Sequence, residues 1–167
     1  MRIERPVLLL LTGFFLSGIF SGISSAADSS PSPLLPLKGL IIQSDRSHGP
    51  IAIPDSRAFR GIDQVRIRFL GSPSYFVGIL ISARNRSGQK VHHGLFDQGP
   101  INEVLSQTFW KTPVLLHIVG LTQLGRKRYL VIEELPKKTE TRIPLEKALS
   151  VLLAQIGTRK DLVWGAN

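Results

Sequence analysis

The most regular pattern of hydrophobic and polar positions lies near the middle of the chain. Apolar and basic residues alternate there in the order Val65, Arg66, Ile67, Arg68, Phe69. A period of two places the apolar side chains on one face and the arginines on the other, as in a half-buried β-strand. The pattern predicts a strand at residues 65–70 with a basic outer face.

The next two segments predict strands that pair with the first. Residues 75–83 are apolar on both faces, which is typical of a central strand covered on two sides. Gly78 within this segment predicts a bulge or a bend. Asn85 to Gly88 is a hairpin signal, so residues 90–96 are expected to return as the antiparallel partner.

A helix and two further strands are expected next. Helical spacing is seen for the apolar residues Ile101, Val104, Leu105 and Phe109. They predict a helix of about three turns, which ends at Pro113. Residues 114–121 and 128–135 then predict two antiparallel strands joined by a turn.

The flanking segments carry weaker patterns. Residues 37–43 and 51–53 predict short strands, and residues 137–142 predict a polar connector. Pro144 suits the first turn of a C-terminal helix. An apolar stripe is formed there by Leu145, Leu149, Leu152, Leu153 and Ile156. This amphipathic helix is expected to cap the open end of the barrel, with docking on a partner as the alternative. Residues 158–167 are expected to fray, apart from Trp164.

The order strand, strand, strand, helix, strand, strand over residues 65–135 resembles the OB-fold, a five-stranded barrel with an inserted helix. The resemblance implies a mainly β fold and a binding face across residues 75–96, between the turns at 71–74 and 122–127. A different small barrel, or an α+β sheet with one covering helix, fits the same order.

The N-terminus has the three parts of a secretory signal peptide. Arg2 and Arg5 precede an apolar run at residues 7–20, and small residues follow at 24–27. We therefore expect a cleaved leader at 1–27, a Ser- and Pro-rich linker at 28–36, and a periplasmic or secreted bacterial protein. The alternative is an uncleaved anchor formed by residues 7–23.

Composition narrows the classes of function. The chain lacks cysteine, which excludes a lipoprotein anchor, thiolate metal sites and cysteine nucleophiles. The net charge is +9 over all 167 residues. Removal of residues 1–27 leaves 19 basic and 11 acidic residues, a net charge of +8. This excess favours acidic partners such as envelope polymers, anionic lipid or nucleic acid.

Eight basic residues are the candidate binding site. They lie on the predicted strand 65–70 and around two hairpin turns: Arg66, Arg68, Arg84, Arg86, Lys90, Arg126, Lys127 and Arg128. The two turns are expected to lie near each other and form an anion-binding rim. The expected partner is a protein or an anionic envelope surface, with a polyanion or nucleic acid as the alternative. The nearby aromatic residues, Phe69, Tyr75, Phe76 and Tyr129, are expected in the core rather than as stacking platforms.

No pattern of catalytic residues accompanies these basic residues. His92 and His93 point to opposite faces of a strand, and the histidine spacing is not that of a zinc site. His93, Asp97 and Ser106 lack a nucleophile-elbow motif, and adjacent Glu133 and Glu134 face opposite sides. We therefore expect a non-catalytic binding protein without cofactor or metal, an envelope accessory or assembly factor. An enzyme of unidentified reaction is the remaining alternative.

Overall fold

The computed structural model describes residues 33–72, 75–162 and 164–166, all within the unit formed by residues 31–167. The predicted signal peptide, its alternative as an anchor, and residues 28–32 of the predicted linker lie outside the described residues. Within the described ranges, no helix is long and apolar enough to cross a membrane. The end of the predicted linker is held by Leu35, which exchanges two backbone hydrogen bonds with Leu121.

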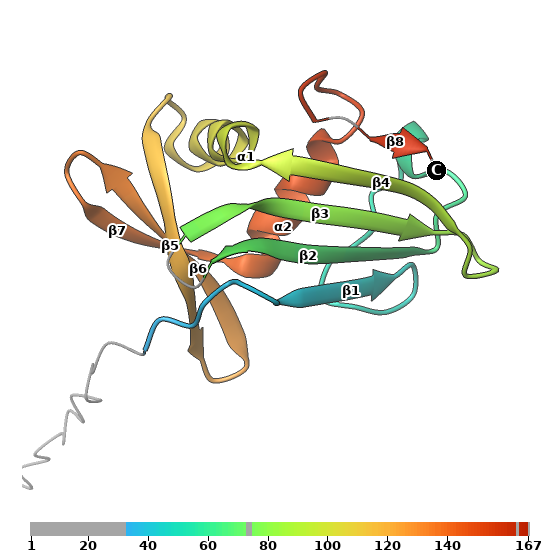
Figure 1. The fold of residues 1–167 in the computed structure, drawn as a ribbon, viewed down its shortest axis with the longest axis horizontal. Helices are drawn as coiled ribbons and strands as arrows, with labels where there is room; N and C mark the ends of the chain where they lie inside the picture. Colours follow the sequence, from blue (N-terminus) through green and yellow to red (C-terminus); the bar gives the residue numbers. More distant parts are fainter. Residues whose placement is uncertain (1–32, 73–74, 163, 167) are drawn as a thin grey trace, which may run out of the picture. The chain divides into compact units, whose positions relative to one another are not determined.

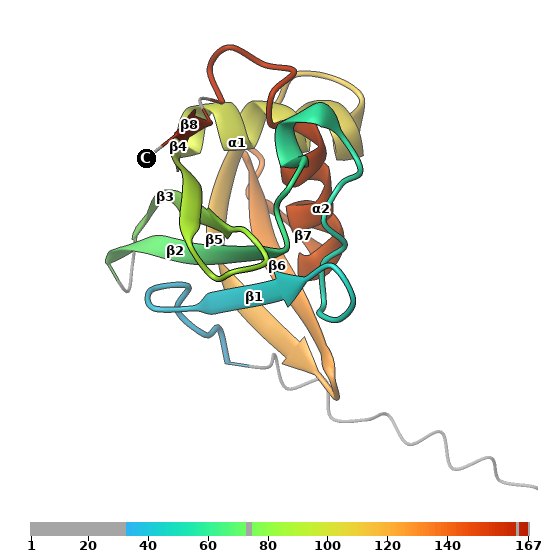
Figure 2. The same ribbon diagram turned by 90° about the vertical axis from the view of Figure 1, so that its right-hand side faces the viewer.

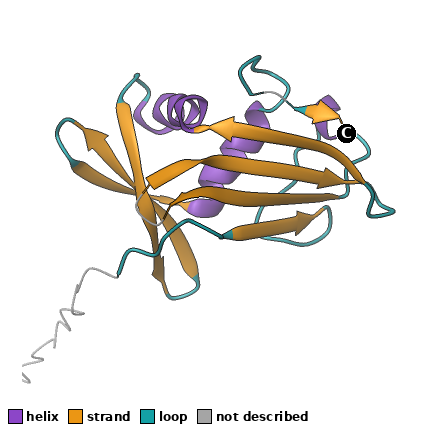
Figure 3. Cartoon of the chain, in the orientation of Figure 1, coloured by secondary structure: helices purple, strands orange, loops and turns teal. Residues whose placement is uncertain are grey.

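The described residues form eight strands in two antiparallel sheets (Figures 1 and 3). The larger sheet has the order β1-β2-β3-β4-β8 and the smaller one the order β5-β6-β7. The strands are β1 (Ile41–Asp45), β2 (Gln64–Ser72), β3 (Tyr75–Arg84), β4 (Lys90–Asp97), β5 (Leu115–Leu124), β6 (Lys127–Leu135), β7 (Thr139–Pro144) and β8 (Gly165–Ala166).

The prediction of a mainly β fold is confirmed, and β2 to β6 lie where the sequence predicts strands. Gly78 does mark a bulge, because the β2–β3 register shifts beside it. A Cβ atom at Gly78 would lie 2.3 Å from the Phe96 carbonyl oxygen, so β4 approaches as closely as only glycine allows. The two sheets are separate in their hydrogen bonding within the described ranges, and closure into one barrel stays a prediction.

Two of the observed strands were not predicted, and one predicted strand is not formed. The segment expected to be a polar connector contains β7, and the segment expected to fray contains β8. Residues 51–53 form no strand, although Ile51 is buried. Strand β7 pairs with the preceding strand β6 across a connection of residues 136–138, whereas β8 pairs with the distant strand β4.

The helices cover one side of the larger sheet. Helix α1 (Gln98–Leu105) continues into a π-helical turn, Ser106–Trp110. The second helix, α2 (Leu145–Gln155), follows β7 and precedes β8. Figures 1 and 2 place α2 behind β2 and β3, along one face of the sheet. Its stripe is buried, with Leu145, Leu149 and Leu153 at most 2% exposed. The helix therefore packs on its own domain, as the capping hypothesis expects.

Burial alternates along β2 as the sequence predicts. Val65, Ile67 and Phe69 are buried in the core, whereas Arg66 and Arg68 are exposed. The larger sheet thus has one face packed on the core and helices and one face open to solvent. The open face carries the candidate site.

Candidate functional site

The register of β1, β2 and β3 brings polar side chains together on the open face of the larger sheet. Gln43 lies opposite Arg66, and Arg66 lies opposite Ser82. Two residues along, Gln64 lies opposite Arg84. Positions directly opposite each other, and positions two apart on one strand, share a face of a sheet. Five side chains from three strands therefore form one polar cluster.

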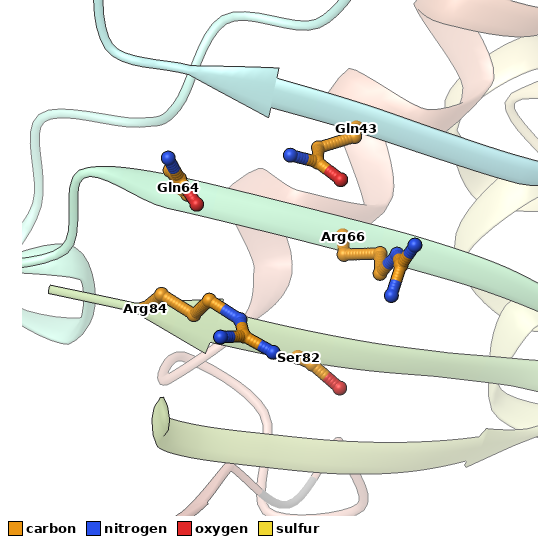
Figure 4. Close-up of a pocket in the computed structure, with 5 residues that line it drawn as sticks. All are labelled: Gln43, Gln64, Arg66, Ser82 and Arg84. Atoms are coloured by element: carbon orange, nitrogen blue, oxygen red, sulfur yellow. The ribbon is translucent and has the colours of Figure 1, made fainter. Parts of the chain in front are cut away.

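This cluster lines a shallow hollow of about 230 Å³ (Figure 4). Its lining residues are Gln43, Gln64, Arg66, Ser82 and Arg84. In Figure 4 the Arg84 side chain extends along the sheet toward Ser82. The hollow has two cationic groups and three neutral polar groups, and no carboxylate lines it. We call these five residues the sheet-face site.

The two arginines differ in how they are held. Arg84 Nη1 donates a hydrogen bond to the Gly88 carbonyl oxygen at 2.8 Å. The turn that presents this carbonyl is closed by two bonds at Asn85, from Gly88 N at 2.9 Å and from Gln89 N at 2.9 Å. The side chain of Arg66 forms no hydrogen bond or ion pair within the described ranges. The remaining guanidinium donors of both side chains are free for a ligand.

Carboxylates on this sheet do not neutralise the arginines. Strands β1 to β4 contribute two acids, Asp45 and Asp97, at strand ends. Asp45 Oδ1 accepts hydrogen bonds from the backbone N–H groups of Ser47 and His48, at 2.8 and 2.5 Å. Neither acid forms an ion pair with Arg66 or Arg84 among the described residues. By register both acids also lie on the open face, Asp45 opposite Gln64 and Asp97 opposite Gly78. The four basic and two acidic residues of this face leave an excess of positive charge.

An apolar row borders the sheet-face site. Arg68 lies opposite Ile41 of β1 on one side and opposite Leu80 of β3 on the other. Leu80 in turn lies opposite Leu95 of β4. Ile41 is 45% and Leu95 58% exposed. Lys90 lies opposite Arg84 at the other border of the site. The open face is thus strongly basic near the β3–β4 turn and becomes apolar farther along the strands.

The predicted rim of two adjacent hairpin turns is not formed. Figure 1 shows the β3–β4 turn at one end of the larger sheet and the β5–β6 turn well away from it, below the sheet. Val119 of β5 approaches β3 at Tyr75 and Phe76. These residues begin β3, whereas Arg84 ends it. The ten residues of β3 span roughly 30 Å, so the two turns are widely separated.

The eight predicted residues therefore divide into three groups. Arg66, Arg68, Arg84 and Lys90 share the open face of the larger sheet. Arg86, Arg126 and Lys127 are exposed at or beside the two separate turns. Arg128 forms an ion pair with Glu146 of α2 at 3.1 Å, which ties β6 to the helix. The sequence missed Gln43, Gln64 and Ser82, of which only Gln64 continues the alternation of β2.

A second hollow, of about 330 Å³, lies between α1 and the end of α2 and is lined by Glu103, Val104, Gln107, Thr108, Gln155 and Arg159. Its single arginine, Arg159, donates to Glu103 at 2.7 Å and to Asp161 at 2.6 Å. The hydrogen bond with Asp161, and then that with Glu103, raises the pKa of the Arg159 guanidinium. The bond from Arg159 lowers the pKa of the Asp161 carboxyl. The charges in this hollow satisfy one another.

The histidines of β4 and β5 have separate surroundings. His92 and His93 do face opposite sides: the His92 ring packs on Trp164, with centroids 5.6 Å apart, and His93 lies opposite Ser82 on the open face. His117 Nδ1 lies 3.5 Å from Glu133 Oε2. Among the described residues, no group of three His, Cys, Asp or Glu side chains is arranged to hold a metal ion.

Two of the residues considered for catalysis make polar contacts with neighbouring residues. Ser106 is buried, and its hydroxyl donates to the Glu103 carbonyl oxygen at 3.1 Å. Glu134 lies 3.5 Å from Lys137 Nζ, on the strand that also carries Glu133.

The four aromatic residues expected in the core differ in exposure. Phe69 and Phe76 are buried, Tyr129 is half-buried, and Tyr75 is exposed.

Comparisons with known proteins add no assignment to this geometry. No protein-family model matches the chain, and the searches of curated proteins and of solved structures found no match.

Proposed function

We propose that the protein is an exported, non-catalytic binding protein that docks on an anionic surface of the cell envelope. The observation that supports this proposal is the open face of the larger sheet, where Arg66, Arg68, Arg84 and Lys90 lie together without ion-pair partners in the described residues. A patch of one charge sign attracts partners of the opposite sign and steers them to the surface.

The sequence predicts contacts at the two hairpin turns, whereas the contact surface proposed here is the open face of the larger sheet. Two separated turns, each with a few flexible basic side chains, lose conformational entropy when they bind. A flat sheet instead presents its four basic side chains from a rigid backbone, beside exposed Ile41 and Leu95. The apolar row adds contact area that salt does not screen.

The test is binding of the full chain to vesicles that contain anionic lipid, with neutral vesicles as reference. A basic residue near an anionic membrane surface contributes about 1 kcal/mol. The variant R66Q/R68Q/R84Q/K90Q is therefore expected to lose roughly two to three orders of magnitude in affinity. The matched control is R57Q/R60Q/K137Q/K160Q, which removes four exposed basic residues that lie outside this face.

Two results would contradict the proposal. Equal loss of affinity in both variants would mean that net charge alone drives binding, and absence of binding by the unaltered protein would remove the proposed surface as a partner. Variant R126Q/K127Q measures whether the β5–β6 turn contributes. It is expected to change the affinity less than tenfold, because that turn lies away from the sheet face.

Single-stranded nucleic acid is the alternative partner and is tested in the same assay with an oligonucleotide. Binding of this kind normally combines basic groups with exposed aromatic platforms. Tyr75 is exposed, but it is the first residue of β3 and Arg84 is the last, so the two lie at the two ends of the strand. We therefore expect the oligonucleotide to bind more weakly than anionic vesicles at equal salt.

A further inference from the structure

The strongest unassigned feature of the molecule is the pair Arg66 and Arg84 in the hollow of the open face. Arg84 lies opposite Gln64, two residues before Arg66, so the arginines are diagonal neighbours on β2 and β3. Diagonal positions on adjacent strands are roughly 7–8 Å apart, within the reach of two long side chains toward a common point. Two like charges at this separation repel each other when nothing lies between them.

The surrounding groups offer hydrogen bonds without adding charge. Ser82 lies opposite Arg66, and Gln43 and Gln64 flank the pair on β1 and β2. The side chains of these three residues have no hydrogen-bond partner among the described residues. A hydroxyl and an amide can each donate one or two bonds. The hollow therefore offers donors from three strands around two positive charges.

Arg84 is already oriented before any ligand binds. Its bond to the Gly88 carbonyl fixes one edge of the guanidinium and leaves the other N–H groups free. An arginine held in this way loses less conformational freedom when it binds an anion. Planar guanidinium forks match the oxygen atoms of phosphate and carboxylate groups in pairs.

The size and charge of the hollow restrict the ligand class. Its volume of about 230 Å³ is smaller than the roughly 300–1,000 Å³ of sites that enclose a whole small molecule. It suits one charged group that projects from a larger partner or from solution. A carboxylate has one charge and two oxygens, whereas two arginines that form no ion pair in the described residues, with three neutral donors, match a group with two charges and more oxygens.

We infer that the sheet-face site binds a doubly charged tetrahedral oxyanion, a phosphate monoester or a free phosphate or sulfate ion, clamped between Arg66 and Arg84. Ser82, Gln43 and Gln64 donate to the oxygens that the arginines leave free. The inference rests on the proposed function, because this subsite would be where an anionic surface makes its specific contact with the open face.

The experiment is calorimetric titration of the full chain with inorganic phosphate at constant ionic strength, with acetate as the carboxylate comparison. We expect saturable phosphate binding and at least tenfold weaker binding by R66Q/R84Q, because both charged donors are lost. The control R57Q/R60Q removes the same charge and is expected to bind as the unaltered protein does. Ser82→Ala is expected to weaken binding about three- to tenfold, the effect of one hydrogen bond.

Three results would each overturn the subsite. The first is phosphate binding by R66Q/R84Q that equals that of R57Q/R60Q, with both variants shown to be folded by circular dichroism. The second is acetate binding as tight as phosphate binding. The third is the absence of saturable phosphate binding by the unaltered protein.

Failure of the subsite and failure of the proposed function give different results. If vesicle binding depends on the four basic residues but phosphate binding does not depend on Arg66 and Arg84, the subsite is wrong and the docking surface stands. If phosphate binding depends on the pair but R66Q/R68Q/R84Q/K90Q still binds vesicles, the proposed function is wrong and the subsite stands.

Discussion

The sheet-face hollow and the hollow beside the helices both contain arginine, but the arginines have opposite surroundings. Arg159, between the helices, is bonded to two carboxylates, Asp161 and Glu103. Arg66 and Arg84, on the open sheet face, are lined by neutral groups and form no ion pair in the part of the chain that the structure describes. The first arrangement connects two segments of the fold. The second leaves positive charge for a partner.

The comparison shows that the number of basic residues says little about where a binding site lies. Arg128, one of the eight candidates, is also paired, with Glu146, and so belongs with Arg159 rather than with the sheet-face arginines. What separates the groups is the location of the carboxylates. These lie near the helices for Arg128 and Arg159, and at the ends of the strands for the larger sheet.

The largest expected effect comes from converting the free arginines into paired ones. Gln64→Glu places a carboxylate opposite Arg84 of β3 and also opposite Asp45 of β1. Phosphate binding should fall at least tenfold. The attraction to Arg84 and the repulsion from Asp45 are each about 0.2–1 kcal/mol, so the stability of the fold should change little. Titration and urea unfolding measure the two effects.

The matched control for that variant is Gln123→Glu, which makes the same charge change on β5 of the smaller sheet, opposite Arg128. It should leave phosphate binding within about twofold, the scale of a surface substitution. Retained phosphate binding by Gln64→Glu would show that the arginines are not the anion contact.

A second expected effect concerns the turn that orients Arg84. Gly88 has φ +80, and a Cβ atom there would meet nothing within 4 Å, so Gly88→Ala changes only the backbone energy. A left-handed conformation costs about 1–2 kcal/mol for a residue other than glycine. We expect that loss of stability in urea unfolding, together with weaker phosphate binding.

Two further variants separate the backbone effect from other causes. Gly88→Asn should lose less stability than Gly88→Ala, because asparagine tolerates this conformation. Gly125→Ala makes the same change in the β5–β6 turn, where φ is +61 and a Cβ atom would also meet nothing within 4 Å; it should lose similar stability without weakening phosphate binding. Equal stability of Gly88→Ala and the unaltered protein would contradict the role of the turn.

The sequence predicts the central strands because their signal is local. Val65, Ile67 and Phe69 alternate with arginines, and the burial of β2 follows that alternation. In β7 only Ile143 is fully buried, so its sequence has no comparable pattern, and the strand forms because β6 offers an edge. The two residues of β8 depend in the same way on the edge of β4.

The candidate site was predicted in part for the same reason. Arg66 and Arg68 were placed on an outer face by the pattern of their own strand. Gln43 and Ser82 join Arg66 only through the register of β1 and β3, which single-strand patterns do not contain. The predicted nearness of the two hairpin turns depended on how the two sheets meet, and that arrangement is set by long-range packing.

A third effect tests the paired arginine. Arg159→Gln leaves Glu103 and Asp161 without their shared cation, and we expect a loss of about 1 kcal/mol of stability. Bonds to charged groups contribute about 1.5–3 kcal/mol, and solvent screening reduces this because the two carboxylates are about half exposed. Arg66→Gln, which breaks no described bond, should change stability by less than about 0.5 kcal/mol. Equal effects of the two substitutions would remove the distinction between the hollows.

The smallest expected effect is the pH dependence of the helix-side pair. Because Arg159 lowers the pKa of Asp161 in the folded protein, this carboxyl stabilises the fold above its ordinary pKa of about 3.9 and loses that contribution as the pH falls through the lower, folded value. In urea unfolding, Asp161→Asn should therefore be slightly less stable than the unaltered protein at pH 7, and the difference should vanish in acid. In an Arg159→Gln background the same substitution should make no difference at either pH. A difference that persists in that background would mean that Asp161 acts through a group other than Arg159.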